Sequence, residues 1–167
     1  MSQRTIAMRV APVTSFWRAV IAGLGGMAVL TSLLYAIPYV GLPKMDLPLF
    51  LGTFFFGDTQ TAYLVGLTAL FSLGVVLALV YAYALYRPID RLFHEASWLR
   101  GICFGSIPWL ALMLAAPLLD LTHPLVVSGE LPVHGLFMLS RGIDWTLSML
   151  GVWLVYGGVM GTLYGDH

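Results

Sequence analysis

Charged residues are scarce in this 167-residue sequence. They make up 10% of the chain, eight basic and eight acidic, whereas hydrophobic residues make up 59%. A soluble domain carries about 25% charged residues, so these few charges could not cover the surface of a water-soluble fold. The mean hydropathy of +0.89 fits a chain whose surface faces lipid. The formal net charge is zero and there is no polybasic arm, so a nucleic-acid partner is not expected.

Cysteine and catalytic motifs are nearly or wholly missing. The single Cys103 excludes an intramolecular disulfide and any CxxC redox or zinc motif. Its apolar neighbours indicate a small buried hydrophobe. The sequence contains no Ser/His/Asp order, GxSxG, P-loop or HExxH motif. It therefore predicts no catalytic residues and no enzyme activity.

Long stretches of the chain lack any charge. Four of them are 19 to 28 residues long, and about 20 helical residues cross the roughly 30 Å hydrocarbon core of a bilayer. None shows the period-two alternation of a membrane barrel. The sequence predicts an all-α polytopic membrane protein, a four-helix transmembrane bundle that forms one domain over residues 1–167. The spanning helices are expected near residues 17–40, 61–86, 100–119 and 144–165.

The basic residues are distributed unevenly between the connections. Six of the eight fall in the N-terminal segment and in the middle connection, residues 87–100. Because basic residues stay on the cytoplasmic side, both termini and the middle connection are expected there. The first apolar stretch is too long for a signal peptide, which predicts an uncleaved first helix. We expect a multi-pass protein of the cell (inner) membrane.

Short apolar segments occupy the connections. Residues 47–56 and 131–139 contain Leu-Pro and are too short to span, so they predict interfacial helices or re-entrant turns on the outer side, the first capped by Asp46. Residues 87–99 predict a short amphipathic helix on the inner side. Matches between the two halves of the chain suggest two repeated helical hairpins, although apolar sequences match one another easily.

Glycines recur at helical spacing in the last and first expected spans. A spacing of four places glycines on one helical face, where a neighbouring backbone can approach closely. The last span is expected to use this face for helix packing, with the first span as its partner; a glycine-lined groove for a substrate or lipid is the alternative. The candidate helix-packing residues are Gly23, Gly26, Gly157, Gly161 and Gly165.

Ionisable residues are absent from the middle of every expected span. Proton relays and ion pathways usually need one, which argues against a pump and leaves a passive pore or lipid-handling protein open. No histidine lies mid-span, so haem ligation between helices is not expected. His123 and His134 share the third connection with several acids, where a metal site is chemically possible. Their spacing fits no standard motif and a solvated loop explains them equally well; no metal or other cofactor is predicted.

Lys44 and Asp46 stand out in the first connection. They are two residues apart and would not face each other on a helix. Lys44 can reach the outer head groups while Asp46 caps the following helix. Contact of these two residues with a partner subunit or a lipid head group is the functional alternative.

Two motifs resemble those of a family of small uncharacterised prokaryotic multi-span membrane proteins. The first connection carries Gly-Leu-Pro-Lys-Met-Asp, and the last helix carries a Tyr-Gly-x-x-x-Gly-x-x-Tyr-Gly run. The residues of the second motif are Tyr156, Gly157, Gly161, Tyr164 and Gly165. A histidine that often starts this run in the family is missing here, so no ligand role carries over. The family has no established activity, and the resemblance implies the membrane topology alone.

These observations predict a non-catalytic membrane subunit or scaffold. We expect it to pack against other membrane protein subunits in a larger complex, such as a respiratory or other electron-transfer assembly. The alternative is a small homo-oligomeric transporter or channel for a neutral or lipid-like solute. A hydrated cavity at mid-membrane would favour the alternative.

Overall fold

The computed structural model describes residues 13–57, 60–92 and 96–165, and within them the chain is helical without strands. Four helices of this described part are long and apolar enough to cross a membrane: Phe16–Val40, Gln60–Arg91, Ser97–Thr122 and Ile143–Tyr164. The chain is therefore an all-α, four-helix membrane protein, as the sequence predicts. The membrane-spanning helices agree with the expected ones to within a few residues, except that the second runs on to Arg91.

The secondary structure gives each spanning helix its bounds. The first span is α1 (Val13–Ala36), which ends in the 3₁₀ turn η1 (Ile37–Val40). The second consists of α3 (Gln60–Val80), the π-helical turn η2 (Tyr81–Leu85) and α4 (Tyr86–Leu92). The third is α5 (Ser97–Thr122) and the fourth is α7 (Ile143–Tyr164). The shorter elements are α2 (Leu47–Gly52), α6 (Pro124–Val127) and the 3₁₀ helix η3 (Leu136–Arg141).

The middle connection differs from the expected amphipathic helix over residues 87–99. Its first part, α4, continues α3 through the π turn instead of starting a separate helix. Its last residues, Ser97–Leu99, form the first turn of α5. The sequence predicts the end of the second span at residue 86 because Arg87 and Pro88 follow, but the helix continues through both residues to Leu92.

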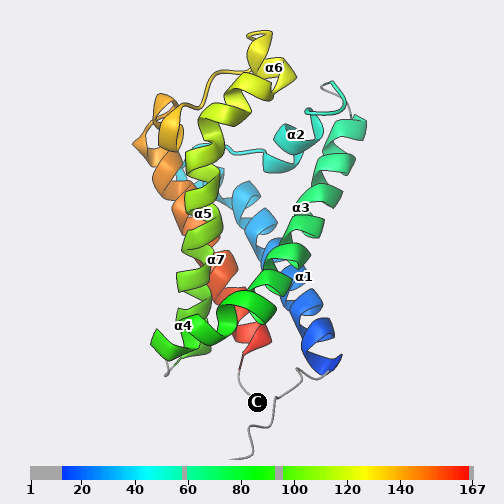
Figure 1. Cartoon of the computed structure of the whole chain (residues 1–167). Coiled ribbons are helices and arrows are strands. Elements are labelled where there is room, and N and C mark those ends of the chain that lie inside the picture. Colours follow the sequence, from blue (N-terminus) through cyan, green and yellow to red (C-terminus); the bar gives the residue numbers. More distant parts are fainter. Residues whose placement is uncertain (1–12, 58–59, 93–95, 166–167) are drawn as a thin grey trace, which may run out of the picture.

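The spanning helices form an open row rather than a closed ring. In the described part of the chain α3 packs on α1, α1 on α7 and α7 on α5, whereas α3 and α5 hardly touch each other. Figure 1 shows α3 and α5 as the two edges of an opening, with α2 across one end and α4 across the other. We refer to these as the α2 end and the α4 end; α1 begins and α7 terminates at the α4 end.

Glycines set the closest helix contacts. A Cβ added to Gly157 would meet the Gly101 carbonyl oxygen and lie 2.8 Å from the Gly105 Cα, so α5 and α7 cross backbone to backbone. Gly161 faces Gly101 and Ser97 in the same crossing. The closest backbone contact of the last helix is therefore with α5, which the sequence does not predict; the predicted partner, the first span, also packs on α7.

The other candidate packing glycines lie at different contacts. Gly23 of α1 faces the backbone of Gly74 in α3, and Gly26 faces the Tyr156 ring of α7. The Tyr156 hydroxyl donates a hydrogen bond of 3.1 Å to the Gly74 carbonyl, which connects α7 directly to α3. Gly165 faces the Ser97 side chain, and its carbonyl accepts a 2.9 Å hydrogen bond from Arg18.

Each half of the chain has short helical segments between its two spanning helices: α2 in the first half, α6 and η3 in the second. The orders α1–α2–α3 and α5–η3–α7 correspond, but α2 packs on α3, whereas η3 contacts both α5 and α7. Duplication of a helical hairpin stays a prediction.

Candidate binding cavity

A cavity of about 510 Å³ lies inside the opening between α3 and α5. Its long walls are apolar: Leu73 and Leu77 come from α3, Ala111 and Leu112 from α5, and Met149 from α7. Ligand pockets have volumes of about 300–1,000 Å³, so this one is large enough for a small molecule. Leu73 is 39% exposed, and Ala111 also lies on the molecular surface, so the walls continue into the lipid-facing edges of the opening.

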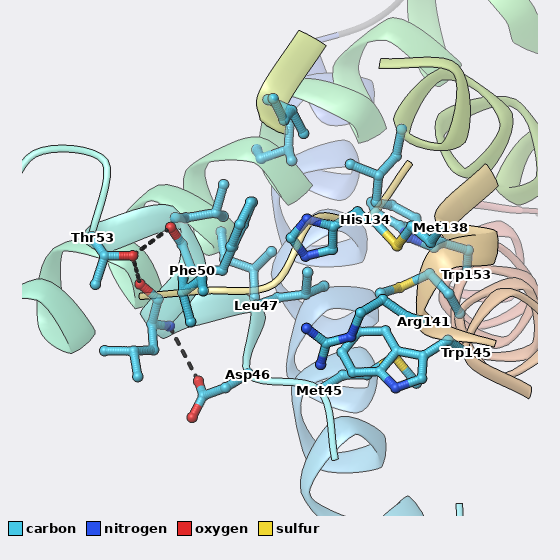
Figure 2. Close-up of a pocket in the computed structure, with 18 of the residues that line it drawn as sticks. Met45, Asp46, Leu47, Phe50, Thr53, His134, Met138, Arg141, Trp145 and Trp153 are labelled. Atoms are coloured by element: carbon cyan, nitrogen blue, oxygen red, sulfur yellow. Dashed lines mark hydrogen bonds between the residues drawn. The ribbon is translucent and has the colours of Figure 1, made fainter. Parts of the chain in front are cut away.

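The helix α2 forms the roof of the cavity at its end of the bundle. Asp46 caps it, as predicted, with Oδ1 accepting a 3.1 Å hydrogen bond from the Leu49 N–H. The helix lies directly on α3 because glycine occurs on both sides of the contact. A Cβ on Gly66 would overlap the Pro48 carbonyl, and a Cβ on Gly52 would overlap Ala62. This close seating brings Phe50 and Thr53 to the cavity (Figure 2).

His123, which directly follows α5, connects the end of that helix to α2. It is fully buried, its ring stacks on Phe50 with centroids 4.5 Å apart, and the edge of Phe54 packs against it. Nδ1 accepts a hydrogen bond from the Leu125 N–H, so the proton lies on Nε2, which donates to the Phe50 carbonyl at 3.1 Å. The Thr53 hydroxyl is 3.2 Å from the same nitrogen. All polar atoms of this ring are used within the protein.

His134 is held by Asp120 at the entrance to η3. The Asp120 carboxylate accepts hydrogen bonds from His134 Nδ1 at 2.7 Å, from the His134 N–H and from the Gly135 N–H. Only 9% of the His134 side chain and 10% of the Asp120 side chain is exposed. These hydrogen bonds fix the start of η3, which lines the cavity opposite α2.

Burial of the two histidines argues against the solvated loop that the sequence had left open. Their environments are also separate: one belongs to α2 and the other to Asp120. Among the residues that the structure describes, no group of three His, Cys, Asp or Glu side chains could hold a metal ion.

The helix η3 has an unusual backbone. Phe137 (φ 54°) and Met138 (φ 55°) both adopt the left-handed conformation, which non-glycine residues rarely use. The Thr146 hydroxyl holds this turn through a 2.6 Å hydrogen bond to the Phe137 carbonyl. The turn places Met138 and Arg141 on the cavity. Strained backbone of this kind concentrates at binding sites, where the surrounding structure maintains it.

Positive charge gathers at the α2 end of the cavity. Lys44 and Arg141 both line it. The Arg141 guanidinium lies over the Trp145 ring, 4.4 Å from the centroid, and Figure 2 shows it directed towards the cavity centre, below His134. Arg141 makes no ion pair or hydrogen bond within the described part of the chain. Deeper in the cavity wall, the buried Trp153 indole N–H is also without a partner among the described residues.

The sequence-based candidates are distributed over two places. Lys44 and Asp46 line the cavity, whereas the packing glycines lie at helix contacts behind it. Sequence reasoning missed Arg141, His134 and Trp145 as cavity residues. One signal existed, because Arg141 and Lys44 are the two basic residues that the charge pattern placed outside.

No protein-family model, curated protein or solved structure matches this chain.

Proposed function

We propose that this chain is a non-catalytic membrane protein that binds a lipid-like amphiphile in the cavity between α3 and α5. The observation that carries the proposal is the lateral opening, because a cavity that faces lipid between two helix edges receives its ligand from the bilayer. An ion or a water-soluble solute would instead need a polar path, and apart from the Trp153 indole the walls at mid-depth are apolar.

The cavity has the polarity of an amphiphile. Its walls from α3, α5 and α7 are apolar, and its polar residues gather at the α2 end. A volume of 510 Å³ is about seventeen times the roughly 30 Å³ that one water molecule occupies. That is space for a substantial part of one acyl or isoprenoid chain. This favours the lipid-handling form of the transporter alternative over a channel.

Membership in a larger membrane complex is the second candidate. Exposed apolar side chains occur on both helices that flank the opening, among them Leu64 and Val76 on α3 and Leu114 and Leu118 on α5. A spanning helix of a partner subunit could cover these edges in place of lipid. In that case the purified protein would bring a membrane subunit with it, and the cavity would bind no added amphiphile.

A tryptophan placed in the cavity tests the first candidate. Ala111 lines the cavity, whereas its neighbour Leu110 is 43% exposed and does not. We expect Ala111→Trp to weaken binding of a fluorescent single-chain amphiphile by about tenfold or more, because the indole fills the ligand's volume. Leu110→Trp should bind like the wild type. Thermal unfolding of both variants in detergent shows that each is folded.

Two results would contradict this function. One is equal binding by Ala111→Trp and Leu110→Trp, which would place the amphiphile elsewhere on the apolar surface. The other is a wild-type protein that binds no amphiphile when other subunits have been removed.

A further inference from the structure

We propose that the ligand is an anionic amphiphile whose acidic head group pairs with the Arg141 guanidinium. This inference rests on the proposed function and adds to it the chemistry of the head group. A carboxylate and a phosphate share this chemistry.

The charges around the cavity carry the inference. Among the acids at the α2 end, Asp46 accepts from the first turn of α2, and Asp120 accepts from His134 and Gly135. Asp144, in the first turn of α7, is exposed and forms no ion pair with Arg141. The bases are not engaged in this way, since neither Arg141 nor Lys44 makes an ion pair within the described residues. The α2 end of the cavity therefore carries two basic side chains that form no ion pair with any described residue.

Arg141 is positioned to receive an anion. It ends η3, and its guanidinium carbon lies over the Trp145 ring, a contact that restricts the orientation of the group; its N–H groups make no hydrogen bond within the described residues. In Figure 2 these groups point into the cavity. A guanidinium binds a carboxylate or a phosphate through two parallel hydrogen bonds, and such charge-assisted bonds are stronger away from water. Half-burial of an unpaired cation beside lipid is costly, and an anionic head group offsets that cost.

The apolar walls place the tail on the other side of the head group. From Arg141 the cavity continues between Leu77 of α3 and Leu112 of α5 towards Trp153 of α7. The Trp153 N–H, without a partner among the described residues, lies along this path and could donate to an ester or other oxygen of the ligand. A ligand with its acidic head group at Arg141 and its apolar chain between Leu77 and Leu112 would therefore match the polarity of the cavity along its length.

Binding of paired lipids tests the inference. Oleic acid and oleyl alcohol share one tail, and phosphatidic acid and diacylglycerol with oleoyl chains share another, so each pair differs by one carboxylate or one phosphate. We expect the purified wild type, by native mass spectrometry in a neutral detergent, to bind the anionic member of at least one pair about tenfold more tightly. The pair that shows the preference tells whether the source is a carboxylate or a phosphate.

Removal of the positive charge of Arg141 is the second part of the test. Arg141→Gln should reduce the affinity for the anionic lipid to that of its neutral partner and leave the neutral lipid unaffected. Arg91→Gln is the matched control, because Arg91 is exposed on α4 at the other end of the bundle and should change neither affinity. The wild-type comparison needs no variant, so it decides even if Arg141→Gln fails to fold.

The outcomes separate this inference from the function on which it rests. Equal binding of charged and neutral lipids, or an anionic preference that survives Arg141→Gln, would overturn the role of Arg141 and leave amphiphile binding intact. Binding of none of the four lipids would overturn both.

Discussion

Gly157 and Gly151 occupy one helix, α7, in opposite surroundings. A Cβ at position 157 would overlap the backbone of α5, whereas a Cβ at position 151 would meet nothing within 4 Å. We expect Gly157→Ala to lower the free energy of unfolding by about 1–3 kcal/mol, because two backbones must separate. Gly151→Ala should leave it unchanged or raise it by about 0.5–1 kcal/mol, since alanine loses less chain entropy in a helix.

Thermal unfolding of the two alanine variants in the same detergent measures this difference. The substitution and the helix are the same, so helix propensity cancels in the comparison. Equal midpoints would show that α5 and α7 do not cross at their glycines.

At the scale of single elements, α2 depends on a histidine from another helix. His123→Phe keeps an aromatic ring against Phe50 but removes the Nε2–H bond to the Phe50 carbonyl and the acceptor for Leu125. We expect faster hydrogen–deuterium exchange in residues 47–53, with α3 and α7 unaffected. The Phe50 carbonyl keeps the Thr53 hydroxyl as a donor at 3.0 Å, so the variant loses one buried hydrogen bond, which costs about 0.5–1.5 kcal/mol.

Thr122→Val is the control for the histidine variant. Thr122 is the preceding residue, and its exposed hydroxyl bonds to carbonyls of its own helix. It should leave exchange in residues 47–53 at the wild-type rate. Unchanged exchange in His123→Phe as well would mean that the glycine contacts with α3 alone hold α2 in place.

The elements show what a sequence can and cannot predict about such a chain. The spans follow from gaps between charges, and the Asp46 cap follows from the residue types at a helix start. Which helices pack against each other does not follow from the sequence. Gly101 and Gly105 are not among the helix-packing residues that the sequence predicts, yet they face Gly157 and Gly161. Any small residue can serve a close contact, and only the tertiary arrangement chooses among the glycines of four helices.

The cavity belongs to the whole molecule and was not predictable for that reason. Its lining comes from α2, α3, α5, η3 and α7, and its charge balance depends on which acids are already hydrogen-bonded. In the sequence Arg141 is one basic residue among several acids. Only the tertiary structure shows that Asp120 is hydrogen-bonded to His134 and does not form an ion pair with Arg141.

Orientation is the prediction that concerns the entire chain. We expect the α4 end, with both termini, to face the cytoplasm, because six of the eight basic residues lie there in sequence. In a Cys103→Ala background, a cysteine at Ser128 should react with an impermeant maleimide in intact cells. A cysteine at Ser2, which lies outside the described residues, should react only after lysis. Labelling of Ser2→Cys from outside would reverse the topology.

The depth of the cavity has a consequence for the membrane around it. The cavity wall on α5 runs from Leu119 to Pro108, and that on α3 runs from Leu70 to Leu77. At 1.5 Å per residue these lengths are about 16 Å and about 10 Å, at most roughly half of the 30 Å hydrocarbon core. A molecule with its head group at Arg141 therefore belongs to a single leaflet, the one at the α2 end. In an asymmetric bilayer the fraction of cavities that hold a ligand would depend on the lipid composition of that leaflet and would not depend on the composition of the other leaflet.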